Sequence, residues 1–427
     1  MKRILLVLLV VTLLVTIAWA GGKQEKEGTV YLRMYYPVGV AGSLAKLMDE
    51  MVADFNESQS DVYVESIFAG GYREAMEKAQ TAFLAGKPPE LAVLDAPTLY
   101  TLRDIDAIIP LDDFIAEEGG DAYVAEFLSA FMEIARAEGK IWSIPWQRST
   151  PIFYYNKDFF REVGLDPNKP PATWTELVEY GKKLKKVDSS GNVTRWGVEI
   201  AINFWLFKPL LLQAGGELDN DPGTKLNIDT PESKEVFQFL LDMAHEHEIM
   251  PAVKKWAETV SDFVAGTTAM LYNSTGALTH IRNSIKYDFG TAYLPAHKRQ
   301  VCIEGGGNFF IFKTDERRQA AAWEVIKWMT RPENTARWSL GSGYIPVKKA
   351  AFDVPEYKKY TDEWPQALTA YKQLSEVDTE RNMMTHAVNE IVVLVNSTTA
   401  EILGGADMNA SLKRAQAEAD KILEAFQ

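Results

Sequence analysis

Residues 144–160, IPWQRSTPIFYYNKDFF, join aromatic side chains to an uninterrupted block of four polar ones. A buried strand needs no such polar block, and an exposed loop needs no such aromatic rings. Flat rings can cover the apolar C–H faces of a sugar, while guanidinium and hydroxyl groups bond its polar rim. Trp146, Arg148 and Ser149 are therefore candidate binding residues for an amphipathic solute.

Further candidates of both kinds stand at predicted loops and strand ends. Asp95 follows the apolar run 91–94, and Ser274 follows the run 269–272. In an open α/β sheet a ligand lies beyond the carboxyl ends of the strands, which favours both positions. One aromatic residue alone is more often part of a core than a sugar platform, so the inference rests on a set at loops and strand ends. Its members are Tyr35, Tyr36, Tyr72, Trp142, Trp146, Trp174, Trp205, Tyr272 and Tyr344.

Residues 304–310, EGGGNFF, place three glycines directly before a predicted strand. Glycine lets backbone N–H groups approach a ligand closely, and it also permits a turn where two lobes meet. Both interpretations stay open, and Gly306 is a candidate ligand contact. The stretch lacks the spacing and the following helix of a dinucleotide-binding loop.

Patterns for enzymatic chemistry are weak. The histidines of 245–248, HEHE, have i, i+2 spacing and do not share a helix face, so no metal site is predicted. The chain has no G-x-S-x-G motif, and the paired acids at 112–113 and 117–118 are expected to open a polar helix. No catalytic residue is assigned. An extracellular hydrolase with two acids distant in the sequence is an alternative.

The N-terminus has the features of a secretory signal peptide. Lys2 and Arg3 precede the nearly apolar segment 4–20, which ends in the small-x-small pattern AWA before Gly21. We expect a signal peptide over 1–20, a flexible tether over 21–28, and a periplasmic or extracellular protein. No cysteine follows the apolar run, so a lipid anchor is not expected. A retained membrane anchor is the alternative.

Composition restricts the class of partner. The formal charge is −14, and removal of Lys2 and Arg3 makes it −14 − 2 = −16. Nucleic acid is not an expected partner, because phosphate backbones require clustered basic residues. The single cysteine, Cys302, cannot form an internal disulfide and is expected to be a small buried residue. A mature chain of about 400 residues favours two lobes over one compact domain.

Hydrophobic periodicity predicts an α/β protein. The order strand, helix, strand, helix, strand over residues 30–94 is typical of a layer built on a parallel sheet. Thr173 with Glu176 resembles a capped start of a helix that reaches about residue 184. The expected strands or turns are 30–36, 62–68, 91–94, 152–155, 262–265, 269–272, 289–293 and 309–313. The expected helices are 41–55, 72–84, 204–214, 232–247, 318–330 and 410–426.

Four longer motifs, in this order, resemble one protein family. They are AFLAGKPPELAVLD at 82–95, TPIFYYNKDFFREVGLDPNKPPATW at 150–174, FVAGTTAMLYNSTGAL at 263–278 and MTRPENTARWSLGSGYIPVKKAAF at 329–352. The chain resembles the extracellular solute-binding proteins of ABC sugar importers, which include maltose-binding protein. Within this family it is most similar to the glycerol-3-phosphate-binding members of the Ugp type. The resemblance covers nearly the whole mature chain.

The resemblance implies a two-lobed α/β fold, in which each lobe has a mostly parallel sheet flanked by helices. Lobe I would hold 29–144 and 300–331, lobe II would hold 145–299 and 332–427, and the ligand would lie in the cleft between them. The polar block of 144–160 would lie on the first crossing and face this cleft. Family members capture solute by hinge closure and deliver it to an ABC permease, so we expect a permease partner, a monomer and no cofactor.

The resemblance also carries the family's ligand contacts to single positions of this chain. They fall on Tyr72, Asp95, Ser149, Ser274, Gly306 and Tyr344, all of which can bond hydroxyl groups. Asp95 replaces a glutamate and is one methylene shorter.

One family contact does not carry over. The arginine that meets phosphate in the family is replaced by Ala387, and loss of such a charge-assisted partner is costly. Arg148 could take over the phosphate, bond sugar hydroxyls or pair with Asp95. We therefore expect a neutral sugar or oligosaccharide, with glycerol 3-phosphate or its diester as the alternative.

Overall fold

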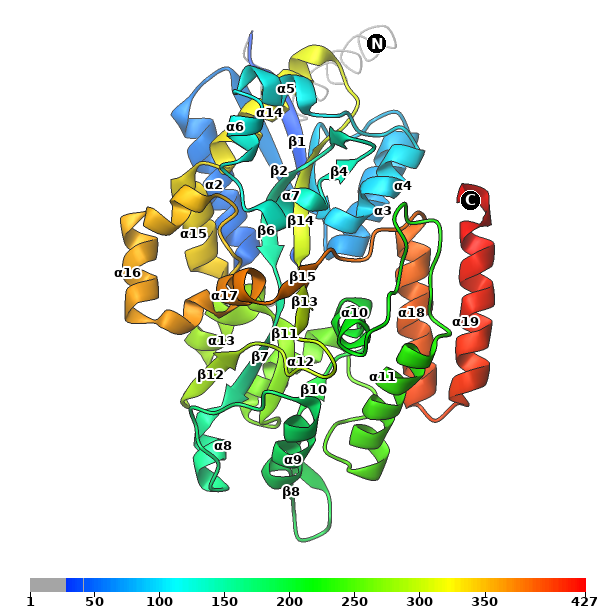
Figure 1. Cartoon of the computed structure of the whole chain (residues 1–427). Helices are drawn as coiled ribbons and strands as arrows, with labels where there is room; N and C mark the ends of the chain where they lie inside the picture. Colours follow the sequence, from blue (N-terminus) through cyan, green and yellow to red (C-terminus); the bar gives the residue numbers. More distant parts are fainter. Residues whose placement is uncertain (1–27, 41) are drawn as a thin grey trace, which may run out of the picture.

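The computed structural model describes residues 28–40 and 42–427. The predicted signal peptide and residues 21–27 of the predicted tether lie outside the described residues. Two β-sheets lie one below the other in Figure 1, each with helices around it. Within the described ranges, no helix is both long and apolar enough to span a bilayer.

The first sheet has five strands in the order β2-β1-β3-β14-β6. All of them point the same way except β14, which is antiparallel to both of its neighbours. Helix α2 buries an apolar stripe of helical spacing that includes Leu44, Met48 and Met51, and it contacts β2. The elements are β1 (Val30–Tyr36), α2 (Leu44–Ser58), β2 (Val62–Phe68), α3 (Tyr72–Leu84), β3 (Leu91–Asp95), β6 (Ile144–Ser149), β14 (Gly305–Ile311) and α14 (Glu316–Met329).

The second sheet has four strands in the order β10-β11-β7-β12. Here β7 is the reversed strand, antiparallel to both β11 and β12. The elements are β7 (Pro151–Asn156), α8 (Lys157–Glu162), α9 (Trp174–Leu184), β10 (Glu199–Ile200), α10 (Phe204–Gln213), α11 (Pro231–Leu241), α12 (Trp256–Ala265), β11 (Met270–Ser274), α13 (Leu278–Ser284) and β12 (Phe289–Ala292).

Strands β7 and β14 are reversed for the same reason. Each directly continues a strand that belongs to another sheet. Only Thr150 separates β6 from β7, and only Glu304 separates β13 (Val301–Ile303) from β14. A chain that crosses from one sheet to the other enters at the carboxyl edge and must run against the strands that end there. The crossings are bonded to each other, since Thr150 Oγ1 donates to the Ile303 carbonyl oxygen at 2.8 Å.

Residues 381–387 form a third segment beside these crossings, because the Asn382 N–H donates to Glu304 Oε1, and we call it the third crossing. It follows β15 (Asp378–Glu380), which pairs with β13, and it leads into α18 (Val388–Leu403) and then α19 (Met408–Leu423). These two helices stand side by side at the right of Figure 1. Helix α15 (Pro332–Ser342) contacts both α2 and α13. The predicted boundaries put α15 and α13 in lobe II and α2 in lobe I. Because α15 contacts both of these helices, the boundaries stay a prediction.

Most expected elements are confirmed, and several have the predicted bounds. Strands β1 and β2 and helix α3 begin and end where the periodicity placed them. Thr173 caps α9, because its hydroxyl accepts from the Glu176 backbone N–H. Cys302 is fully buried, as expected.

The prediction of a strand or turn at 262–265 is wrong. These residues form the last turn of α12, which ends at Gly266 in the left-handed conformation at φ +75°. The run was too short to distinguish a strand from a helix, and the helical spacing of Val260 and Phe263, both buried, decides it.

A buried cluster of charges beside the third crossing should be important for stability. Asp219 has a fully buried side chain and pairs with Lys208 at 2.6 Å and with Arg381 at 2.9 Å. Replacing Asp219 with asparagine leaves the buried Lys208 ammonium group without its counter-charge. We expect Asp219→Asn to lower the free energy of unfolding by about 3 kcal/mol in urea denaturation.

The control is the exposed pair Lys46–Glu50, at 3.4 Å along α2. Glu50→Gln should change the free energy of unfolding by less than about 0.5 kcal/mol, because exposed pairs contribute little. Equal effects of the two substitutions would contradict the importance of the buried cluster.

Candidate functional site

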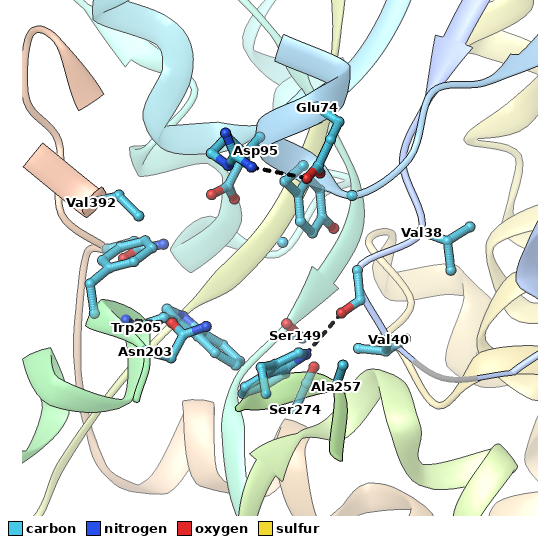
Figure 2. Close-up of a pocket in the computed structure, with 18 of the residues that line it drawn as sticks. Val38, Val40, Glu74, Asp95, Ser149, Asn203, Trp205, Ala257, Ser274 and Val392 are labelled. Carbon is cyan, nitrogen blue, oxygen red and sulfur yellow. Dashed lines mark hydrogen bonds and ion pairs between the residues drawn. The ribbon is translucent and has the colours of Figure 1, made fainter. Parts of the chain in front are cut away.

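A cavity of about 730 Å³ lies between the two sheets. This volume is in the range of small-molecule binding sites. Residues from both sheets line it, together with residues that follow α15 and residues of the third crossing and α18. In Figure 2, Asp95 and Glu74 lie above the cavity, Asn203 and Trp205 lie to its left, and Ser274 and Ala257 lie below it.

The carboxyl ends of strands contribute polar groups from both sheets. Asp95 ends β3, Ser149 ends β6 and Ser274 ends β11, and all three line the cavity. Ser274 Oγ accepts from the Gly276 N–H at 3.0 Å, so its hydroxyl hydrogen can point to a ligand. Asp95 and Ser274, which the strand-end argument favoured, thus line the same cavity as Ser149, which was a candidate from the polar block. Their contact with a ligand stays a prediction.

Two tryptophans form the aromatic side of the cavity. Trp205 and Trp256 lie in the first turns of α10 and α12, with ring centroids 6.1 Å apart and ring planes at 68°. The indole N–H of Trp205 donates to the Glu304 carbonyl oxygen at 3.1 Å. That of Trp256 donates across the cavity to the Gly39 carbonyl oxygen, also at 3.1 Å. This second bond is drawn as a dashed line in Figure 2.

Two glycines of β14 have steric roles at the floor of the cavity. Gly306 has φ +92°, and a Cβ there would lie 1.7 Å from the Gln147 carbonyl oxygen. A Cβ on Gly305 would lie 2.5 Å from the Trp205 ring. The glycines let β14 pass close to β6 and let the indole lie flat on the backbone, so the steric explanation accounts for their presence.

Tyr72 and Tyr344 lie against each other in the lining of the cavity. Tyr72, the first residue of α3, bonds Gln147 Oε1 through its hydroxyl at 3.0 Å. Burial raises the pKa of Tyr72 well above its usual range and that of Tyr344 to about 12. Both hydroxyls therefore keep their protons at neutral pH and can donate hydrogen bonds.

Asp95 is the carboxylate with the most perturbed environment in the cavity. Burial raises the pKa of Asp95 to about 7, while the charge of Arg148 acts in the opposite direction. Near neutral pH the carboxyl group is therefore present in both forms. It can accept a hydrogen bond when ionised and donate one when protonated.

The lining of the cavity has no cation without a counter-charge among the described residues. Arg73 pairs with Glu77 at 2.8 Å and with Glu74 at 3.3 Å. The first turn of α10 is already capped, because Asn203 Oδ1 accepts from the Trp205 N–H and Asn396 Oδ1 accepts from the Phe204 N–H. With Asp95 and Glu74 in the lining, an anionic group finds little complementary charge here.

Three predicted site residues do not line the cavity. Trp146 is 1% exposed and packs against Phe309 and Trp338. Trp174 lies between the rings of Phe239 and His297, and its indole N–H donates to Gln213 at 2.8 Å. These rings fill cores on either side of the cleft.

Arg148, the third of these residues, lies behind the cavity wall and is fully buried. It forms an ion pair with Glu304, and none of the ion pairs of the described residues joins it to Asp95. Burial lowers the pKa of the guanidinium to about 10, so Arg148 stays charged at neutral pH. Of the polar block, only Ser149 reaches the cavity.

Several lining residues were absent from the predicted set. Trp256 and Asn382 come from a helix start and from the third crossing, neither of which has a sequence signal for binding. Asn203 could have been found as the helix N-cap before Trp205. Ala387 does not line the cavity, although Val388 and Asn389 directly after it do.

The part of the chain that the structure describes contains no group of three or more His, Cys, Asp or Glu placed to hold a metal ion. The cavity is instead an aromatic corner with hydroxyl, amide and carboxyl groups opposite. A family model described as bacterial extracellular solute-binding protein matches residues 50–366. The chain belongs to this family of bacterial extracellular solute-binding proteins.

The solute-binding protein has relatives at both the sequence and the structural level. It is 29% identical over 381 residues to the sn-glycerol-3-phosphate-binding periplasmic protein UgpB of Brucella abortus, covering 86% of this chain and 87% of that protein. UgpB from Mycobacterium tuberculosis, in complex with glycerophosphocholine, matches with a TM-score of 0.81 and 25% identity over 94% of this chain and 100% of that chain.

A third match concerns the fold alone. The maltose/maltodextrin-binding domain of Bdellovibrio bacteriovorus, bound to maltotriose, has a TM-score of 0.79 and 21% identity over 92% of this chain and 100% of that chain. The expected resemblance and the two-lobed α/β fold are confirmed. In the solute-binding protein, one strand is reversed in the five-stranded sheet and one in the four-stranded sheet.

The titration of Asp95 should be visible in stability. Its pKa is about 7 in the folded protein and about 4 in an unfolded chain, so between these values the folded state holds a proton that the unfolded state has released. The contribution of Asp95 to stability is therefore present at low pH and falls as pH rises through this window. Compared with wild type, Asp95→Asn should gain at least about 2 °C in melting temperature between pH 5 and pH 8.

The measurement is a melting curve of the ligand-free protein at several pH values. Ser149→Ala is a matched control, because it changes a neighbouring lining residue without removing a titrating group. Parallel pH curves for wild type and Asp95→Asn would contradict the raised pKa.

Proposed function

We propose that this protein is the solute-binding component of an ABC importer for a neutral sugar or oligosaccharide. The family match supports the transport role. The chemistry of the cavity supports the class of ligand, because an aromatic corner suits C–H faces and the opposite polar groups suit hydroxyls.

The main support for a neutral ligand is that the described lining contains no cation without a counter-charge. A phosphate would need a charge-assisted donor, but Arg73 already pairs with two glutamates and Arg148 is buried with Glu304. Arg148 is thus already engaged and is poorly placed to replace the arginine missing at position 387. Asp95, when ionised, adds negative charge at the cavity.

Glycerol 3-phosphate or a glycerophosphodiester is the second candidate. It is favoured by relatives whose names record glycerol-3-phosphate binding and a complex with glycerophosphocholine. Helix α3 also begins at the cavity without a side-chain cap, which leaves backbone N–H groups near the ligand space.

Capture would proceed by closure of the two lobes about the crossings. Lobe I would hold 29–144 and 300–331, and lobe II would hold 145–299 and 332–427. The bond from Trp256 to the Gly39 carbonyl oxygen joins the two sides of the cavity, and it shows how near they lie in the present arrangement. A ligand that bonds both sides would shift the population towards the closed state.

The remaining parts of the proposal follow from the family and the N-terminal sequence. The signal peptide 1–20 would be removed on export, and the chain would act outside the cytoplasm without a lipid anchor. Its partner would be the membrane permease, and it would bind solute as a monomer without catalysis, cofactor or nucleic acid. We infer that Tyr72, Asp95, Ser149, Trp205, Ser274, Gly306 and Tyr344 contact the ligand.

The class of ligand can be tested with a thermal-shift panel of maltose, maltotriose, mannotriose, glycerol 3-phosphate and glycerophosphocholine. We expect the melting temperature to rise with one or more of the sugars, because a ligand that binds only the folded state stabilises it. The affinity of a neutral ligand should change little with added salt, whereas that of a phosphate should fall. A shift restricted to the two phosphate compounds would overturn the choice of sugar.

The site can be tested with two tryptophan substitutions. Trp205→Ala removes a ring of the cavity and should weaken the affinity for the bound sugar at least about tenfold. Trp174→Phe is the control, because that ring lies outside the lining. Titration calorimetry measures both, and a loss of affinity that is larger for Trp174→Phe would show that the ligand lies elsewhere.

A further inference from the structure

The ion pair of Arg148 with Glu304 lies directly beneath the cavity. The two side chains are 0% and 1% exposed. Arg148 Nη1 also donates to the Gly306 carbonyl oxygen at 2.9 Å and to Asn308 Oδ1 at 3.2 Å. The guanidinium lies over the Phe131 ring, with its central carbon 5.2 Å from the ring centroid. Arg148 is therefore fixed by several contacts, and it holds the Glu304 carboxylate in one place.

Glu304 connects two further segments to this pair. Its Oε1 accepts from the Asn382 backbone N–H at 2.8 Å, and its carbonyl oxygen accepts from the Trp205 indole N–H at 3.1 Å. Trp205 and Asn382 both line the cavity. One residue at the second crossing thus joins the first crossing, the third crossing and the aromatic corner.

Stability alone does not explain a buried charged pair at this place. Removing two charges from water is costly, and packed apolar residues of similar volume often serve the stability of a fold equally well. Apolar residues, however, have no atom that accepts from the Asn382 N–H. An apolar side chain at position 304 also makes no ion pair that holds the main chain there in place. The carbonyl oxygen of this residue is the acceptor of the Trp205 indole N–H.

We propose that Glu304 is a positioning residue for ligand capture, which holds Trp205 and Asn382 in place while Arg148 fixes its carboxylate. The inference rests on the proposed function, because it requires a ligand in this cavity, but it applies to any ligand there. Glu304 acts through the two lining residues and does not itself line the cavity.

The test compares two double variants that remove the buried charges together. Arg148→Met/Glu304→Leu leaves no acceptor for the Asn382 N–H, whereas Arg148→Met/Glu304→Gln restores one. The first should weaken the affinity for the panel compound that wild type binds about tenfold, and the second should recover most of the loss. Arg148→Met/Glu304→Gln should melt close to wild type, because it leaves no unpaired buried charge and keeps an acceptor. Arg148→Met/Glu304→Leu should melt lower, because the buried Asn382 N–H loses its acceptor.

A ligand-free measurement separates this inference from the proposed function. In protein with ¹⁵N-labelled tryptophan, the indole N–H resonance that disappears in Trp205→Phe belongs to Trp205. This resonance should move in Arg148→Met/Glu304→Leu and move less in Arg148→Met/Glu304→Gln. If wild type binds no compound of the panel, the proposed ligand class fails, while the indole resonance still decides the role of Glu304.

The matched control is the pair Arg195–Glu162 at 2.8 Å, which joins β9 (Val193–Arg195) to α8 and has no residue in the cavity lining. Arg195→Met/Glu162→Gln should alter neither the affinity nor the Trp205 resonance. If Arg148→Met/Glu304→Leu does not fold, Glu304→Asp keeps the charge but draws the carboxylate back by one methylene, and it should show the same two effects.

Three results would overturn the inference. The first is wild-type affinity in Arg148→Met/Glu304→Leu or, should that variant not fold, in Glu304→Asp. The second is an unmoved Trp205 resonance in the same variant. The third is an equal loss of affinity in the Arg195→Met/Glu162→Gln control, which would mark a general effect on stability.

Discussion

A guanidinium buried between two sheets imposes the constraint on which the rest of this structure depends. Arg148 has no exposed surface, so the protein must supply its counter-charge, although its Nε–H has no acceptor among the described residues. Glu304 supplies the counter-charge from the next crossing, and Gly306 and Asn308 supply acceptors from β14. These contacts hold Gly306 opposite Arg148 in the register of β14 on β6, which shifts between Gly307 and Asn308.

The shape of the cavity follows from that register. With β14 held against β6, only glycine fits at 306, where a Cβ would meet the Gln147 carbonyl oxygen. Gly305 leaves room for the Trp205 ring, and the Glu304 carbonyl oxygen turns that ring by accepting its N–H. The same crossings set the direction of β7 and β14, so the strand ends of both sheets face one cavity.

Local pattern predicted much of the fold, and it predicted those candidate residues whose position depends on a strand end. Asp95 and Ser274 are brought together because strands of both sheets end at the cleft, and Ser149, a candidate from the polar block, joins them at the end of β6. Pattern could not separate Trp205, which lines the cavity, from Trp146 and Trp174, which fill cores. An aromatic ring contributes the same apolar area in either place, and only its neighbours in space decide which use it has.

The sequence by itself determined the alternation of strands and helices, the acidic charge, the candidates at strand ends and the resemblance to a family of solute-binding proteins. These properties are encoded by periodicity, composition and ordered motifs over short stretches of chain. Tertiary structure alone decided that Arg148 pairs with Glu304, 156 positions along the chain by the difference 304 − 148, and that Trp256 faces Trp205. Such partners are set by the crossing of distant segments, because a buried charge is costly without a partner and that partner need only be near in space, not in sequence.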